Sequence, residues 1–197
     1  MIKVKKLVLL SPDETCPAGM TPVRIAPMDL LGQNVAYRPW DPTTHALLEL
    51  MEEYVKPGMR FMDIGSGSGT LTVAAAALGA TEVYATDIQR ESVAETKKNA
   101  QLNKFVIEAE VVNEKETPKG KPCDVIVANL GEAKWIESHL EALIGLLKKG
   151  GRLLATVASN DVDFINVKAE FAGLAVDPSS APVGAGSWVV VNFRKVT

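Results

Sequence analysis

Three glycines separated by single serines follow a short apolar run in FMDIGSGSGTL, at residues 61–71. Glycine adopts backbone conformations that other residues avoid, and it lets a ligand touch the main chain. A bare loop between a strand pattern and a helix pattern is therefore typical of a nucleotide or nucleoside site. The loop departs from a dinucleotide fingerprint, because Thr70 stands where that pattern needs a glycine. It also departs from a Walker phosphate loop, since no lysine follows the last glycine.

Two acids accompany the loop. Asp63 stands just before the first glycine, and Asp87 closes the next apolar run, EVYATD. A carboxylate at the end of the second strand of such a unit reaches the ribose hydroxyls of a bound nucleoside. The alternative is a glycine-rich turn in which Asp87 only caps the following helix. The loop and the two acids together favour a nucleoside cofactor.

Alternating strand and helix patterns surround these residues. The strand patterns lie at 59–64, 82–87, 105–112, 123–130 and 151–158, and the helix patterns lie at 44–55, 70–80, 90–103, 133–150 and 161–173. The last residues, 174–196, predict a hairpin. This alternation predicts an α/β fold with a Rossmann-like, doubly wound, mostly parallel sheet and a C-terminal antiparallel hairpin strand. Ligands of such sheets bind outside the carboxyl ends of the strands, which is where the glycine loop falls.

Residues 1–42 differ from the rest because prolines interrupt two short strand patterns, at 2–10 and 22–27. We expect an N-terminal extension over 1–42 with little room for its own core, and a cofactor-binding domain over 43–197. The first helix should begin with Thr43 or Thr44 as its N-cap. In the helix pattern at 133–150, an apolar stripe includes Ile144 and Leu147, and the Lys-Lys-Gly-Gly run at 148–151 should end that helix.

Composition narrows the possible partners. The chain has 197 residues, of which 47% are hydrophobic and 23% charged, and its formal net charge is −3. This charge argues against broad non-specific binding to nucleic acid, although a local basic patch stays open. The two cysteines, Cys16 and Cys123, have no metal-like spacing, and Cys123 should open a buried strand as a small hydrophobe. Because no apolar run is long enough to span a bilayer, we expect a cytoplasmic protein with no membrane partner.

The glycine loop and the two acids resemble those of the class I S-adenosylmethionine-dependent methyltransferases, over roughly residues 43–195. The resemblance implies S-adenosyl-L-methionine as cofactor, with the first acid and the loop at its methionine part and the second acid at its ribose. The residue after the second acid would lie against the adenine, and Asn113 or Glu114 would lie near the adenine amine. With the two threonines described next, the implied cofactor-binding residues are Thr43, Thr44, Asp63, Gly65, Ser66, Gly67, Gly69, Asp87, Ile88 and Asn113.

A closer resemblance is to the ribosomal-protein lysine methyltransferase (PrmA) family. It is carried by DPTTHALLELM, MDIGSGSGTLTVAAAALGATEVYATDI and DVIVANL. The family's Pro-Thr-Thr approaches the cofactor and maps to residues 42–44, and its strand-end asparagine near the methyl group maps to Asn129. There are two departures: Asp41 stands where the family has a histidine, and the residues before Thr43 are too few for the family's separate N-terminal substrate domain.

The resemblance implies a methyltransferase whose acceptor is a protein side-chain amine. A small metabolite, RNA, and a cofactor-binding module without catalysis remain as alternatives, and the oligomeric state stays open. Asn129 could form a hydrogen bond with an amine but could not act as a strong base, and it could also be only a strand-end turn residue. The following Leu130-Gly131-Glu132 lacks the Pro-Pro-Tyr slot for planar groups, which disfavours methylation of bases or amides. Trp40 could cover the cofactor or anchor the extension.

Overall fold

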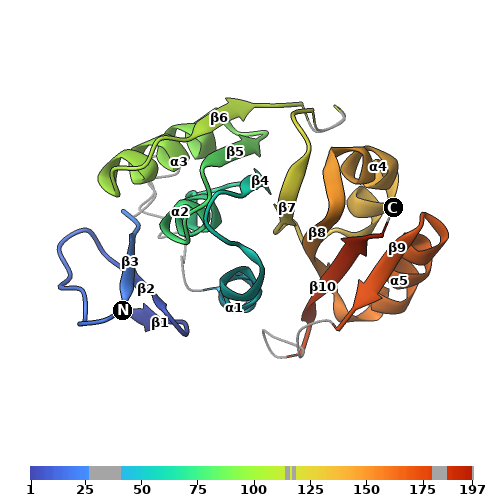
Figure 1. The fold of residues 1–197 in the computed structure, drawn as a ribbon, viewed down its shortest axis with the longest axis horizontal. Helices are drawn as coiled ribbons and strands as arrows, with labels where there is room; N and C mark the ends of the chain where they lie inside the picture. Colours follow the sequence, from blue (N-terminus) through green and yellow to red (C-terminus); the bar gives the residue numbers. More distant parts are fainter. Residues whose placement is uncertain (27–40, 114–115, 117–118, 179–185, 197) are drawn as a thin grey trace.

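The structure is a computed structural model that describes residues 1–26, 41–113, 116, 119–178 and 186–196. Its main feature is a seven-stranded sheet with the order β6-β5-β4-β7-β8-β10-β9 (Figure 1). The strands are β4 (Arg60–Ile64), β5 (Glu82–Asp87), β6 (Glu108–Val111), β7 (Cys123–Ala128), β8 (Leu147–Ala158), β9 (Leu174–Asp177) and β10 (Trp188–Lys195). The strands β4 to β8 pair in parallel, whereas β10 runs antiparallel to both β8 and β9. The predicted fold class, including the closing hairpin, is confirmed.

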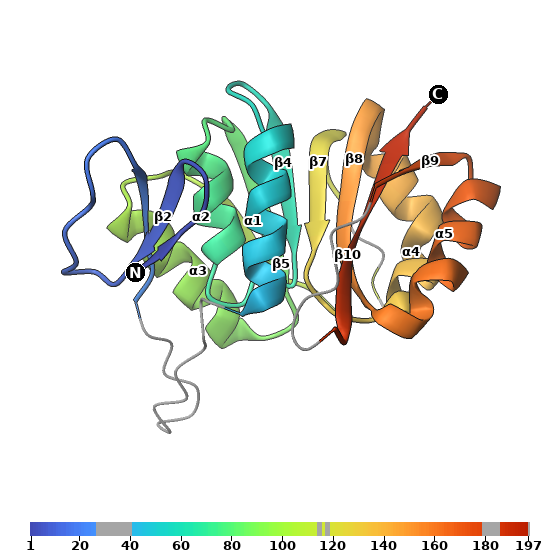
Figure 2. The ribbon, with the colours of Figure 1, turned by 90° about the horizontal axis from the view of Figure 1, so that it is seen from below.

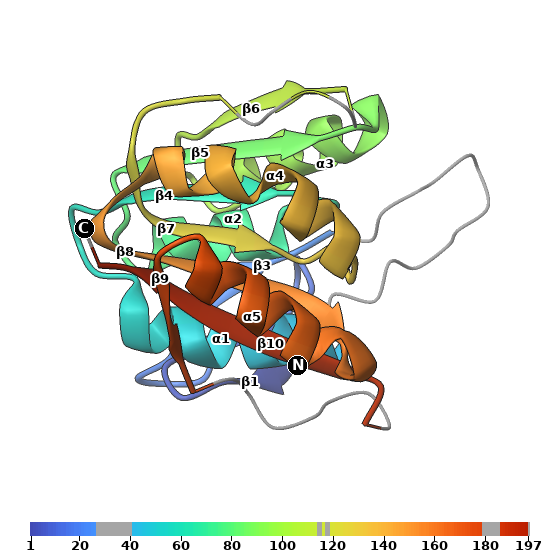
Figure 3. The same cartoon turned by 90° about the vertical axis from the view of Figure 1, so that its right-hand side faces the viewer.

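Helices cover both faces of this sheet. They are α1 (Pro42–Tyr54), α2 (Thr70–Ala77), α3 (Arg90–Leu102), α4 (Ala133–Leu146) and α5 (Val162–Phe171), with a 3₁₀ turn, η1, at Ser159–Asp161. The first three lie on one side of the central strands and the last two on the other (Figure 2), and α4 and α5 face the viewer in Figure 3. Within the described ranges, no helix combines the length and the apolar character needed to cross a membrane.

The two faces of the sheet contribute side chains to two separate hydrophobic cores, because successive strand residues point to opposite sides. In β4, Phe61 belongs to the cluster under α1 to α3, and Met62 belongs to the cluster under α4 and α5. In β7, Val125 and Ile126 divide in the same way. This alternation fixes the register of the strands and therefore the positions of the residues at their carboxyl ends.

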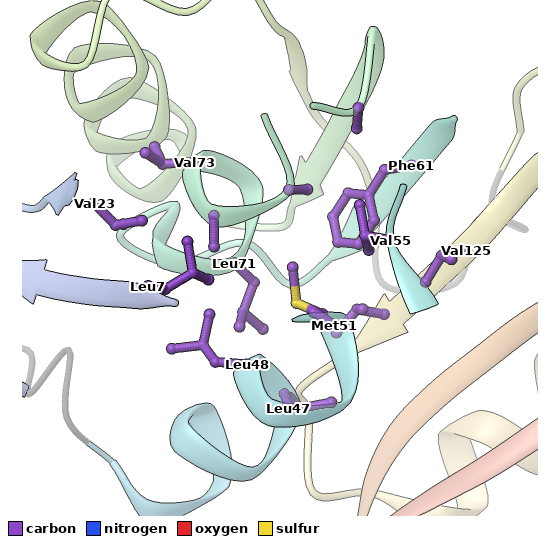
Figure 4. Packing of buried hydrophobic residues seen from close by; sticks show 14 of the residues in the cluster. Leu7, Val23, Leu47, Leu48, Met51, Val55, Phe61, Leu71, Val73 and Val125 are labelled. Atoms are coloured by element: carbon purple, nitrogen blue, oxygen red, sulfur yellow. The ribbon is translucent and has the colours of Figure 1, made fainter. Parts of the chain in front are cut away.

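The N-terminal residues form a second sheet from β1 (Ile2–Lys3), β2 (Leu7–Leu10) and β3 (Thr21–Arg24). Apolar side chains of this small sheet join the larger core: Leu7 and Val23 belong to the cluster that contains Leu47 and Leu71 (Figure 4). Polar contacts reinforce this packing. The Glu52 carboxylate of α1 accepts the N–H groups of residues 6 and 7 at 2.8–2.9 Å. The small sheet of β1 to β3 is thus packed directly onto the helices of the larger sheet.

The start of α1 departs from the prediction. The N-cap is Asp41, whose Oδ1 accepts a hydrogen bond from the backbone N–H of Thr43 at 2.8 Å, so neither Thr43 nor Thr44 is the cap. Pro42 occupies the first turn, where its missing N–H costs no hydrogen bond. The two threonines are buried instead, and the Thr44 hydroxyl lies 3.3 Å from the side-chain nitrogen of Asn129, just beyond the carboxyl end of β7.

The end of α4 also departs from the prediction. The helix ends at Leu146, and Leu147 is the first residue of β8, where it pairs with Cys123. The Lys-Lys-Gly-Gly run therefore does not end the helix but forms an irregularity within β8, where the pairing skips ahead to Arg152 opposite Val125. Glycine suits this bend, because a Cβ on Gly151 would lie 2.8 Å from the backbone oxygen of residue 148. The third predicted strand is likewise shorter, since β6 begins at Glu108 rather than at residue 105.

Cys123 behaves as its position in the sequence predicts. It opens β7 and is 1% exposed. Burial raises the pKa of its thiol to about 11, so the thiol stays protonated and unreactive at neutral pH. Its role is packing, as a small apolar side chain.

Candidate functional site

The glycine loop leaves the carboxyl end of β4 and opens α2. Gly65, Gly67 and Gly69 have φ angles of 75°, 53° and 78°, all in the left-handed region that side chains with a Cβ avoid. Gly69 is the N-cap of α2 and provides no side-chain cap. The three glycines are therefore required by the path of the main chain, and they leave that chain bare at the end of the strand.

Neighbouring elements hold the loop in this shape. The N–H groups of Gly65 and Ser66 both donate to the carbonyl oxygen of Thr86 in β5, at 2.8 and 3.0 Å. The Ser66 hydroxyl lies 2.9 Å from the hydroxyl of Thr96 in α3. Helix α3 also packs directly on the loop, because a Cβ on Gly69 would lie 2.8 Å from the Cα of Thr96. Contacts with β5 and α3 thus fix the conformation of the loop.

Asp87 ties the loop to the end of β5. One carboxylate oxygen accepts the N–H of Gly67 at 2.9 Å, and the other accepts the N–H of Gln89 at 2.8 Å. Each oxygen can accept a further hydrogen bond, for example from a sugar hydroxyl. The N-cap of α3 is Gln89, so the alternative reading of Asp87 as a helix cap is wrong. Ile88 follows with 55% of its surface exposed, beside the carboxylate.

Asp63 is the most deeply buried acid of the site, with 1% exposure. Burial raises its pKa to about 6; a hydrogen bond from the Thr72 hydroxyl, at 2.6 Å, acts in the opposite direction, and the charge of Asp87 raises the pKa further. The two carboxylates therefore repel each other in a dry environment. A cationic ligand would relieve this repulsion, whereas an anionic phosphate would increase it.

A second cluster of polar side chains lies near the carboxyl ends of β7 and β8. Thr156 accepts the N–H of Gly131 at 3.0 Å, so its single hydroxyl proton is directed to Asn129, whose Oδ1 lies 3.0 Å away. The Asn129 side-chain N–H₂ group donates in turn to the Thr44 hydroxyl at 3.3 Å. The Asn129 amide is therefore held from both ends, and its orientation is set by the strand behind it.

Asn129 and Thr43 share a cavity of about 390 Å³. Both residues are among those that the sequence predicts for the site, whereas Thr156 and Trp188 are not. The sequence signal for Thr156 is a hydroxyl inside the apolar strand pattern LLATVA. The described residues that line this cavity are Asp41, Thr43, Asn129, Leu130, Gly131, Thr156 and Trp188. A larger cavity of about 450 Å³ opens on the sheet face around Met62 and Tyr84 and contains no predicted site residue.

The remaining predicted positions lie at the edge of the site or beyond it. Asn113 is exposed, and the preceding residue donates its N–H to the Asp87 carbonyl oxygen at 2.9 Å, so Asn113 lies at the same end of the sheet. Glu114 and Trp40 fall outside the described residues. Among the residues that the structure does describe, no group of three or more His, Cys, Asp or Glu side chains could hold a metal ion.

Comparison with known proteins shows which family this chain resembles. The family described as Ribosomal protein L11 methyltransferase (PrmA) matches residues 41–171. A ribosomal protein L11 methyltransferase of Symbiobacterium thermophilum is 37% identical over 138 residues, which cover 70% of this chain and 43% of that protein. The corresponding protein of Aquifex aeolicus is 33% identical over 135 residues, covering 68% of this chain and 52% of that protein. The chain thus spans about half the length of these relatives.

Solved structures agree with the sequence relatives. The ribosomal protein L11 methylase of Lactobacillus delbrueckii subsp. bulgaricus superposes with a TM-score of 0.77 at 25% identity, covering 98% of this chain and 96% of that one. The magnesium protoporphyrin IX methyltransferase of Synechocystis, at 17% identity and a TM-score of 0.64, shares the fold over 76% of this chain. Together with the family match over residues 41–171, these findings show that the chain belongs to the ribosomal protein L11 methyltransferase (PrmA) family.

Proposed function

We propose that this chain is an S-adenosyl-L-methionine-dependent methyltransferase that methylates a side-chain amine of a protein. Ribosomal protein L11, the protein named in the family and its relatives, is the first acceptor to test. In this proposal residues 43–197 form the cofactor-binding domain and residues 1–42 an N-terminal extension to it. The observation that carries the proposal is the hydrogen bond from the Gly67 N–H to Asp87, which joins the bare loop to a carboxylate at the next strand end.

The residues of the site fit this cofactor. The positive φ angles of the glycines leave room for a ligand against the main chain. The carboxylate of Asp87, with acceptor capacity on both oxygens, suits the two ribose hydroxyls, and exposed Ile88 suits the adenine face. Buried Asp63 and the loop would hold the methionine part with Thr43 and Thr44, and Asn113 would border the adenine. Two neighbouring carboxylates favour a cationic sulfonium ligand over its neutral product.

When bound, the cofactor supplies an activated methyl group on a sulfonium, so the protein's task is mainly alignment. Asn129 is the residue placed to align the acceptor nitrogen, because its amide stands at the end of β7 and lines the cavity beside Thr43. Thr156 and Thr44 prevent this amide from rotating. The amide is not basic, so the acceptor amine has to reach the neutral form without help from Asn129.

Transfer of a labelled methyl group tests the proposal. The purified chain is incubated with methyl-labelled S-adenosyl-L-methionine and purified ribosomal protein L11, and label is expected in lysine residues of L11. Asp87→Ala should abolish the transfer. Glu91→Ala removes an exposed carboxylate from the first turn of the neighbouring α3 and serves as the matched control that should retain it. Cofactor binding without transfer to L11 or to any other protein of a cell extract would overturn the proposal. Label in RNA or in small metabolites would then assign another acceptor class, and no label in either would indicate a module without catalysis.

A further inference from the structure

The cavity at the ends of β7 and β8 carries two groups that recognise cations. One is the Asp41 carboxylate at the start of α1, and the other is the Trp188 indole at the start of β10. We propose that this cavity is the acceptor subsite and that Asp41 and Trp188 select a protonated primary amine. The inference rests on the proposed function in taking the acceptor to be an amine, and it adds the residues that choose this acceptor by its charge.

The Asp41 carboxylate is fixed in place but not saturated. Its Oδ1 accepts the Thr43 N–H at 2.8 Å and the Thr43 hydroxyl at 2.6 Å. A carboxylate has about four acceptor positions on its two oxygens, so capacity remains for an ammonium group. Because Asp41 is exposed to solvent and lines the cavity, an incoming ligand can reach it.

The Trp188 ring lies close to the main chain at Gly131. Trp188 is 37% exposed and begins β10, where it pairs with Ala158 of β8. Its six-membered ring lies so close to Gly131 that a Cβ there would be 2.6 Å from Cζ3. Glycine at position 131 is therefore what allows the ring to lie beside Asn129. A partly exposed indole of this kind attracts an ammonium group through the negative face of its ring.

The charge balance of the cavity favours a cation over an anion or a neutral ligand. Among the described residues that line it, Asp41 is charged and negative, and none is basic. An ammonium group held between Asp41 and Trp188 would share the cavity with the Asn129 amide. The subsite thus captures the charged amine, and loss of its proton is a separate and later requirement of methyl transfer.

Binding of small probes tests the selection without any methyl transfer. The side-chain indole signal of Trp188 is followed by NMR while n-butylammonium, which resembles a lysine side chain, or the neutral 1-butanol is added. We expect saturable shifts with n-butylammonium and none with 1-butanol. Asp41→Asn should weaken n-butylammonium binding at least fivefold, and α1 should persist because asparagine caps a helix as well as aspartate does. Glu49→Gln, which removes the same charge from the exposed side of α1, should bind like the parent protein.

Two outcomes would overturn the inference. In one, the Trp188 signal responds equally to both probes, or Asp41→Asn binds n-butylammonium unchanged. In the other, Asp41→Asn weakens calorimetric binding of S-adenosyl-homocysteine, which would assign Asp41 to the amino-acid end of the cofactor. Neither measurement depends on turnover, so failure of the L11 transfer assay and failure of the subsite are distinguishable.

Discussion

The two halves of the site are built in different ways. The proposed cofactor side comes from the end of β4, the loop that follows it and one acid at the end of β5. Backbone N–H groups of the loop donate hydrogen bonds to the Thr86 carbonyl oxygen and to the Asp87 carboxylate. The proposed acceptor side comes from separate segments: Asp41 at the N-cap of α1, the ends of β7 and β8, and the start of β10. The first half is encoded locally, whereas the second exists only once the strands are in register. Variants of the two halves should therefore affect different measurements.

The largest effect is expected from Asp87→Ala on cofactor affinity. Hydrogen bonds to a charged group contribute about 1.5–3 kcal/mol each, so losing two ribose contacts should weaken binding by about 100-fold or more. The variant also leaves the Gly67 N–H without its partner and loosens the loop. Calorimetry with S-adenosyl-homocysteine measures the change. An unchanged affinity would remove the ribose role and with it the distinction between the two halves.

The next effect is expected from Gly69→Ala on stability. Its φ of +78° strains any side chain, and the new Cβ would lie 2.8 Å from the Cα of Thr96. We expect a loss of about 3 kcal/mol in the free energy of unfolding, measured by urea denaturation, from strain and overpacking together. Gly58→Ala is the matched control, because its φ is +85° but a Cβ there meets nothing within 4 Å. Equal losses in both variants would mean that the packing of α3 on the loop contributes nothing.

The pH dependence of stability should report on Asp63. Its pKa is about 6 in the folded protein and near 3.8 when exposed, so between these values the folded state binds more protons than the unfolded state. Stability then falls as the pH rises from about 4 to 6, by about 2–3 kcal/mol in total for this group. Asp124 and Asp177, whose pKa values are lowered in the folded state, contribute in the opposite direction. The comparison is therefore made between the parent protein and Asp63→Asn.

The expected result is a difference in unfolding free energy between the two proteins that shifts in favour of Asp63→Asn as the pH rises through this window. A constant difference from pH 4 to 7 would show that Asp63 ionises at its ordinary pKa. The same burial predicts that a cationic ligand binds more tightly above pH 6, where the carboxylate is charged.

The contrast between the two halves also explains which residues of the site could be predicted from the sequence. The glycine loop, Asp63 and Asp87 could be predicted because spacing along one stretch of chain encodes their geometry. The N-cap of α1 was misassigned because Asp41, Thr43 and Thr44 all have side chains that cap helices. The end of α4 was misassigned because an apolar residue at 147 suits both the helix stripe and a buried strand. The division of the chain at residue 42 stays a prediction.

Thr156 and Trp188 could not be predicted, because their roles depend on pairing between distant strands. Thr156 is placed by β8, whose neighbouring Ala155 pairs with Ala128 just before Asn129. Trp188 reaches the cavity because β10 inserts antiparallel beside β8, opposite Ala158. Neither pairing leaves a signal in the spacing of residues. The acceptor half of the site therefore emerges from the sheet topology rather than from a motif.

The smallest effect, and the sharpest test of the contrast, is expected from Thr156→Val on turnover. Valine matches the shape of threonine but removes the hydroxyl between the Gly131 N–H and the Asn129 oxygen. The freed amide should sample other orientations, and we expect kcat to fall about tenfold, which corresponds to about 1.4 kcal/mol. The affinity for S-adenosyl-homocysteine should not change, because Thr156 lies on the acceptor side. Thr156→Ser keeps the hydroxyl and should restore most of the activity. If serine and valine behave alike, the hydroxyl does not position Asn129, and if the cofactor affinity falls as well, the two halves are not separable.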